Sequence, residues 1–123
     1  MRKFKFLDWQ VYKDSRDLFS EILKIVKKLP KEYRFELGSQ VIRSSLSITL
    51  NIAEGSGKES DKELVRFIEI SLGSAYETLA CLDSMRNSEL ITLVEFNNLQ
   101  EKISSVCNQL GGLKKKVVLT EKL

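Results

Sequence analysis

The stretch NIAEGSGKES, residues 51–60, is where this chain comes nearest to a phosphate-binding loop. A Walker A loop has the pattern G-x-x-x-x-G-K-[ST], in which the hydroxyl after the lysine holds Mg²⁺. Here Gly57-Lys58 is followed by Glu59, whose carboxylate would repel phosphates, and Ile52 stands in place of the first glycine. The residues before the loop also favour a helix rather than a buried strand. These differences exclude a Walker A site.

The same stretch has the features of a connection between two helices. Gly55 can adopt the left-handed conformation that ends many helices, and we expect it to do so here. Ser60 and Glu63 fit the capping box S-x-x-E, in which two side chains satisfy two free amides at a helix start. The stretch therefore predicts a helix end, a short loop and a helix start.

The composition excludes several kinds of catalytic and metal site. The chain has no histidine, the commonest general base and a frequent zinc ligand, so triad mechanisms are excluded. No pattern brings carboxylates from several helices to one point, as a carboxylate metal site in a bundle requires. Cys81 and Cys107, the only cysteines, are interpreted as buried structural thiols, and a redox pair would require two helices to bring them together. We predict no catalytic residue, no metal and no cofactor, and hence no enzyme.

The length of 123 residues fits one domain that buries a core without disulfides or metals. One proline and six glycines favour long helices over many short strands. No segment is long and apolar enough to span a bilayer, and the N-terminus lacks the apolar run of a signal peptide. The expected location is the cytoplasm, with no membrane contact.

Apolar residues repeat at steps of three and four along most of the chain, the period of amphipathic helices. Four such helices joined by short loops predict an all-α fold, an antiparallel up-down-up-down four-helix bundle in a single domain, residues 1–123. The expected helices cover about 8–29, 34–54, 60–86 and 92–118.

The last predicted helix has the clearest pattern. Thr92 and Glu95 form a second capping box at its start. An unbroken apolar seam runs from Phe96 to Val117 and is expected to pack against the other helices. Gly111-Gly112 weaken the helix late, so its end is expected to fray or bend away.

The second and third helices contain small and polar residues where apolar ones are expected. In the second helix the apolar stripe is interrupted at Ser44 and Ser45. Two interpretations of its polar stripe stay open: a solvated face, or a contact surface for another subunit or a nucleic acid. In the third helix, Gly73 begins a run without bulk at which a neighbouring helix could approach closely. The polar stripe consists of Gln40, Arg43, Ser44, Ser47, Asn51 and Glu54.

Residues 40–58, QVIRSSLSITLNIAEGSGK, resemble the pattern Q-I-R-R-A-A-x-S-I-x-x-N-I-A-E-G of the four-helix-bundle proteins encoded in bacterial 23S rRNA intervening sequences. The Avd accessory proteins of retroelements are similar to these. Residues 67–85 resemble a second motif of the family, F-L-x-I-A-x-G-S-x-x-E. The matching residues, named signature residues below, are Gln40, Arg43, Ser47, Ile48, Asn51, Ile52, Ala53, Glu54, Gly55, Lys58, Phe67, Ile70, Gly73, Ser74 and Glu77.

The chain also departs from the family pattern. Ile42 stands where the family often has the first of two arginines, and Ser44 and Ser45 stand where it often has alanines. The loss of one positive charge weakens a phosphate-binding role for this segment and leaves the fold unaffected.

The resemblance implies a cytoplasmic, non-catalytic bundle that assembles into a ring-like homo-oligomer, commonly a pentamer. It implies RNA or DNA as a partner, and also a reverse transcriptase if the chain is of the retroelement branch. The signature residues expected to serve assembly are Gln40, Arg43, Ser47, Asn51, Glu54, Gly55, Gly73, Ser74 and Glu77.

The net charge of +3 is unevenly spread, with ten Lys or Arg against five Asp or Glu in residues 1–34. Binding would rest on phosphate neutralisation and counterion release. No aromatic-basic platform is evident, so base-specific recognition is not expected. In the alternative hypothesis the protein is a scaffold whose polar stripe is buried between subunits. The candidate phosphate contacts are Lys13, Arg16, Lys24, Lys27, Lys28, Arg43, Lys58, Lys114, Lys115 and Lys116.

Overall fold

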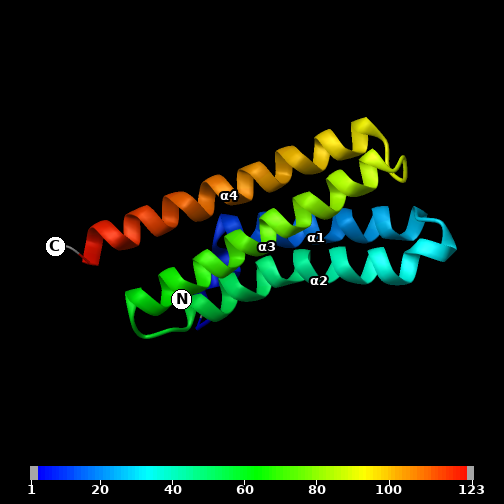
Figure 1. Ribbon diagram of the computed structural model, residues 1–123. Coiled ribbons are helices and arrows are strands. Elements are labelled where there is room, and N and C mark those ends of the chain that lie inside the picture. The colour runs from blue at the N-terminus through cyan, green and yellow to red at the C-terminus, as the bar shows by residue number, and fades with distance from the viewer. Residues whose placement is uncertain (1–2, 122–123) are drawn as a thin grey trace.

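The computed structural model describes residues 3–121, with side chains to residue 119, and consists mainly of long helices (Figure 1). Successive helices run in opposite directions and pack against each other, and α1 and α4 close the bundle. The predicted all-α four-helix bundle is confirmed, and every predicted boundary lies within three residues of the observed one. The elements are η1 (Lys5–Asp8), a 3-10 turn, and the helices α1 (Gln10–Lys28), α2 (Lys31–Ser56), α3 (Asp61–Asn87) and α4 (Leu93–Glu121).

The break between α1 and α2 is confirmed at Leu29-Pro30, and α2 begins three residues earlier than predicted, at Lys31. Leu29 is extended, as expected for a residue before proline. The carbonyl of Pro30 accepts the backbone N–H of Tyr33 and of Arg34, so the new helix starts directly after the proline. Arg34 also donates from its guanidinium to the Leu29 carbonyl, at 3.0 and 3.3 Å, which satisfies a free acceptor at the end of α1.

The two predicted capping boxes differ in the structure. At the start of α4, the Thr92 N–H donates to Glu95 Oε1 at 2.9 Å and the Glu95 N–H donates to Thr92 Oγ1 at 3.0 Å, which confirms that box. At the start of α3, the Glu63 N–H donates to Ser60 Oγ at 3.1 Å. The Glu63 carboxylate lies 3.5 Å from Arg66 Nη1. The start of α3 therefore has the bond to the Ser60 side chain, together with an ion pair between Glu63 and Arg66.

A single hydrophobic core runs along the bundle, and α4 extends past it. The predicted seam of α4 is buried from Phe96 to Leu110, whereas Leu113 and Val117 are only partly covered. The end of α4 diverges from the start of α3 (Figure 1). The expected fraying after Gly111-Gly112 is not observed, because the helix continues to Glu121.

Buried hydroxyl groups occupy places in the core where apolar residues were expected. Thr78 Oγ1 donates to Ser44 Oγ at 2.8 Å, and Thr49 Oγ1 donates to Ser15 Oγ at 3.1 Å. Every buried side-chain polar atom in the described residues has a hydrogen-bond partner. At the interruption of the α2 stripe, Ser44 is bonded to Thr78 of α3 and Ser45 donates to the Val41 carbonyl within α2, which avoids the cost of an unpaired buried polar group. The buried polar residues are Ser15, Ser44, Ser45, Thr49, Ser71 and Thr78.

The prediction that Gly55 ends α2 in the left-handed conformation is wrong, and the close approach predicted at Gly73 is not made by a helix of the same chain. α2 continues through Gly55 to Ser56, and no glycine in the described residues has a positive φ. Gly55 is buried instead, and a Cβ at this position would lie 2.8 Å from Phe67 Cβ. Gly73 is exposed, and a Cβ there would have no neighbour within 4 Å. Close approach of α3 to α2 therefore requires a glycine at position 55 and not at 73.

We expect opposite effects from alanine at these two glycines. Gly55→Ala should lower the free energy of unfolding by about 1–3 kcal/mol, because its methyl group meets Phe67 Cβ, which side-chain rotation cannot move away. Gly73→Ala should raise it by up to about 1 kcal/mol, because helix propensity improves in open space. Urea denaturation at a protein concentration at which light scattering shows single chains measures both. Equal stability of the two variants would contradict the close approach at Gly55.

Candidate nucleic-acid interface

Four of the predicted cations share the outward face of α1. Lys13, Arg16, Lys24 and Lys27 lie opposite the buried side of the helix and are partly or fully exposed. Their spacing places them within a narrow sector of the helix, since three residues and eleven residues are each close to whole turns. From Lys13 to Lys27 the face extends about 21 Å, at 1.5 Å per residue. We name these four residues the basic α1 face.

The charges on the basic α1 face are only partly neutralised within the chain. No ion pair joins Lys13 or Lys27 to a carboxylate of the described residues. Lys24 Nζ lies 3.3 Å from Glu21, an exposed pair of the kind worth at most about 1 kcal/mol. The Arg16 guanidinium lies 5.8 Å from the ring centroid of Tyr12, which orients it without removing its charge. The face is therefore available to an external anion.

Lys28, predicted with this group, is held by a carboxylate of another helix. Its Nζ lies 3.2 Å from Glu95 Oε2, at the start of α4. Glu95 also accepts the Thr92 N–H, and this backbone hydrogen bond, followed by Lys28, holds the pKa of Glu95 below its ordinary value. Lys28 thus joins α1 to the cap of α4.

The other predicted cations lie away from the basic α1 face. Arg43 is exposed on α2 and makes no ion pair with a described residue. Lys58, in the loop after α2, lies 3.9 Å from Glu54 and 5.1 Å from the ring centroid of Phe67. Lys114 lies 3.9 Å from Glu69 near the end of α4, and the two lysines that follow it directly, Lys115 and Lys116, are exposed.

Signature residues of α2 contact signature residues of α3. Gln40 Nε2 donates to Glu77 Oε2 at 2.7 Å, and the hydroxyls of Ser47 and Ser74 lie 2.8 Å apart. Asn51 Nδ2 donates to the carbonyl of Ser47 at 2.8 Å. The polar stripe was interpreted either as a solvated face or as a contact surface for another molecule. Neither interpretation describes this arrangement fully, because several side chains of the stripe form hydrogen bonds with α3 of the same chain.

Some signature residues have no contact in the chain that explains their type. Arg43 and Gly73 are exposed, and Ile70 is 39% exposed. Leu50, which is 55% exposed, lies at the same level as Ile70, because the neighbouring Ser71 donates to the Ile48 carbonyl. We name Arg43, Leu50, Ile70 and Gly73 the outer α2–α3 face.

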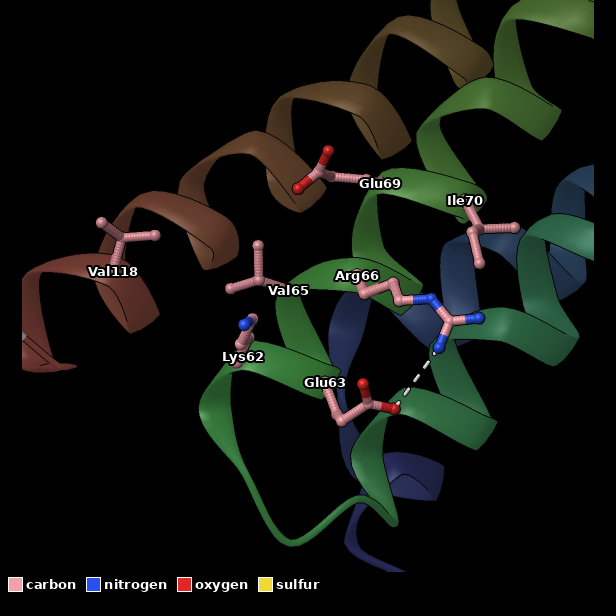
Figure 2. A pocket seen from close by; sticks show the side chains of 7 residues that line it. All are labelled: Lys62, Glu63, Val65, Arg66, Glu69, Ile70 and Val118. Carbon is pink, nitrogen blue, oxygen red and sulfur yellow. Dashed lines mark ion pairs between the residues drawn. The ribbon is translucent and has the colours of Figure 1, made fainter.

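A hollow of about 510 Å³ opens where the start of α3 diverges from the end of α4 (Figure 2). Two cations, Lys62 and Arg66, are balanced there by the carboxylates of Glu63 and Glu69, and Arg66 points toward Glu63. The rest of the lining is aliphatic, including Val118 from α4. Balanced charges give this hollow no preference for an anion or a cation.

No arrangement typical of catalysis was found in the part of the chain that the structure describes. Within residues 3–121, no group of three or more His, Cys, Asp or Glu could hold a metal ion. Both cysteines are free and half-buried, and burial raises the pKa of the Cys81 and Cys107 thiols. A raised pKa keeps a thiol protonated and weakly nucleophilic at neutral pH, as expected for structural thiols.

One group of basic and aromatic residues was not predicted from the sequence. Lys3, Phe4, Lys5, Phe6 and Trp9 surround a hollow beside the end of α2. The alternation Lys-Phe-Lys-Phe before the only tryptophan is the signal that could have identified it.

Comparison with known proteins gives one family and one fold. A family model described as 23S rRNA-intervening sequence protein matches residues 7–112. The chain is also similar to a crystal structure of a protein of unknown function from the S23 ribosomal protein family of Bacteroides thetaiotaomicron VPI-5482. The TM-score is 0.80 at 24% identity, over 85% of this chain and 98% of that one, and this likeness supports the fold alone.

Among curated proteins, none matches the chain. None of the helices within residues 3–121 is long and apolar enough to cross a membrane.

The Glu95 contacts predict a dependence of stability on pH. Glu95→Ala should lower the free energy of unfolding by about 1 kcal/mol at pH 7, because it removes half of a capping box and the partner of Lys28. The folded pKa of Glu95 is lowered, so its contribution is present above the unfolded pKa and is lost as pH falls through the folded one. In urea denaturation, the difference from the unmodified protein should therefore shrink between pH 5 and about pH 3. A difference that is the same at both pH values would contradict this assignment.

Proposed function

Because the chain belongs to the 23S rRNA-intervening sequence protein family, we propose that it is a non-enzymatic, ring-forming bundle that binds the phosphate backbone of RNA or DNA. It would act as an accessory factor in a ribonucleoprotein rather than as a catalyst. The pentameric copy number is an expectation from the family resemblance, and a reverse transcriptase partner is expected only if the chain is of the retroelement branch.

The observation that carries the proposal is the basic α1 face. Lys13 and Lys27 carry charges without a partner in the described residues, and Arg16 and Lys24 lie between them on the same side of the helix. A length of about 21 Å corresponds to roughly six nucleotide steps of one strand at 3.4 Å each. The four cations form two pairs, Lys13 with Arg16 and Lys24 with Lys27, about 12 Å apart along the helix, with the exposed Asp17 between them. Each pair can contact phosphates of one backbone.

Assembly would increase the effect of this face. The net charge of +3 is small for one chain, but a ring of identical subunits repeats the same four cations in each copy. Binding that depends on phosphate neutralisation grows with the number of phosphates contacted, and its salt dependence grows in proportion. Contacts of this kind do not distinguish sequences, so the proposed recognition is of backbone and shape.

The outer α2–α3 face is the surface we propose for assembly. It combines the exposed apolar side chains of Leu50 and Ile70 with Gly73, where any side chain would have open space in one chain. A glycine inside a helix costs about 1 kcal/mol relative to alanine. Close approach of a second copy at Gly73 would offset that cost.

The alternative is a protein scaffold that does not bind nucleic acid. The contacts of Gln40, Ser47 and Asn51 are made within the chain, so these side chains are not free for a nucleic acid or for another subunit. The alternative therefore depends on the exposed residues of the outer α2–α3 face. In this alternative Arg43 would be buried and paired between subunits, since an unpaired buried charge is costly. The two hypotheses differ in their prediction for the basic α1 face, to which the scaffold assigns no role.

Charge reversal on the basic α1 face should weaken nucleic-acid binding. We expect Lys13→Glu with Lys27→Glu to lower the affinity for a blunt 20-base-pair RNA duplex. The slope of log K against log salt should decrease in magnitude by about one to two, because up to two phosphate contacts are lost. Fluorescence anisotropy at several salt concentrations measures both quantities.

The matched control is Lys62→Glu with Lys102→Glu, which changes the net charge equally at exposed or partly exposed positions on α3 and α4 that are not candidate phosphate contacts. This control should change the slope less. An equal effect of the two pairs would contradict the assignment to α1. If the unmodified protein does not bind at low salt, the proposal is overturned and the scaffold hypothesis is retained.

The assembly surface can be tested without disturbing the single chain. Gly73→Arg adds bulk where no atom lies within 4 Å of the new Cβ, so the subunit should fold and fail to assemble. Gly112→Arg is the matched control, because that glycine is equally open but lies on α4. Light scattering after size-exclusion chromatography should show smaller particles for Gly73→Arg alone. Unchanged particle size in that variant would exclude the outer α2–α3 face.

A further inference from the structure

A hollow of about 500 Å³ lies between the N-terminal segment and the end of α2. Phe4, Phe6 and Trp9 supply aromatic rings on one side, and Lys58 follows the end of α2 on the other. Its volume is within the range of small-molecule sites, which is about 300–1,000 Å³. The hollow therefore combines flat apolar surfaces with nearby cations.

The aromatic wall is held in place by its own contacts. The Phe4 and Phe6 ring centroids lie 6.4 Å apart, and Phe6 packs edge-on against Tyr12 at 4.9 Å. The carbonyls of Phe4 and Phe6 accept the backbone N–H groups of Leu7 and Trp9 within the η1 turn. Phe4 nevertheless remains 58% exposed. An exposed ring on an ordered turn is suited to stacking, because little freedom is lost when a ligand binds.

The charges around the hollow favour an anion. Three lysines line it, Lys3, Lys5 and Lys58, against one carboxylate, Glu54, which lies 3.9 Å from Lys58. The aromatic cluster also connects to the basic α1 face, because Tyr12 contacts Phe6 on one side and lies 5.8 Å from Arg16 on the other. A ligand that follows the basic α1 face toward the start of α1 would therefore reach this hollow.

We infer that the hollow binds an unpaired nucleotide of a nucleic acid. The base stacks on the Phe4 ring, and the flanking phosphates contact Lys3, Lys5 and Lys58. This inference rests on the proposed nucleic-acid binding and adds to it a preference for single-stranded ends or bulges. Stacking tolerates every base, since each has an aromatic face, and the site therefore selects unpaired structure rather than sequence.

The test compares three ligands with the full chain at one salt concentration: hexaadenylate, a hexamer of the same phosphates with abasic sugars, and a blunt RNA duplex. Trp9 is the only tryptophan, so its fluorescence reports directly on the hollow. Hexaadenylate should quench Trp9 and the abasic hexamer should not. Phe4→Ala should weaken hexaadenylate binding at least about fivefold, leave duplex binding unchanged, and be rescued by Phe4→Trp, with affinity followed by anisotropy.

The matched control is Phe35→Ala, which removes a ring that is 82% exposed near the start of α2. It should leave both affinities unchanged. Equal binding of the abasic hexamer or of hexaglutamate would show a general polyanion surface and overturn the inference. Duplex binding without any gain for hexaadenylate would overturn the inference and retain the proposed function. Loss of binding to every ligand at low salt would overturn both.

Discussion

The close approach of α3 to α2 is the constraint on which the rest of the bundle depends. Gly55 leaves no side chain between the two helices, so Phe67 lies directly against the backbone of α2. With the helices at this distance, Ser47 and Ser74 can share a hydrogen bond and Gln40 can reach Glu77. A larger residue at position 55 would separate these pairs together. The close packing leaves room only for short side chains in this contact, and the hydrogen bond between Ser47 and Ser74 in turn stabilises the packing.

The packing of α2 against α3 affects where the charged side chains of α1 lie. Its inner surface carries buried hydroxyls that are satisfied within the bundle, and the apolar seams of α1 and α4 cover the core from the other side. Charged side chains of α1 are left on its outward face, where only one of the four basic residues, Lys24, has an ion-pair partner in the described residues. Exposed cations at this spacing add little to stability, and their value to the protein would lie in an external partner.

The helices were predictable because the apolar period is local information, and the positions of Pro30 and Thr92 fix two of the breaks. The role of Gly55 was not predictable from the sequence, because a glycine between a helix and a loop favours a left-handed helix end. Only the position of Phe67 in the folded chain shows that Gly55 allows close packing of two helices instead. The sequence also could not show that no helix of the same chain approaches Gly73. The row of cations on α1 follows from helix periodicity, whereas the hollow beside Trp9 joins residues some fifty positions apart in sequence and needs the folded chain.

The signature residues divide into those that one chain explains and those that it does not. Gln40, Ser47, Gly55 and their partners hold α2 to α3, so their chemical types follow from the fold. An exposed arginine at 43 and an exposed glycine at 73 gain nothing from the same contacts. Alanine at 73 would stabilise the helix and a neutral residue at 43 would leave it intact. Selection for folding alone therefore gives no reason for either residue, and a second molecule against the outer α2–α3 face gives a reason for both.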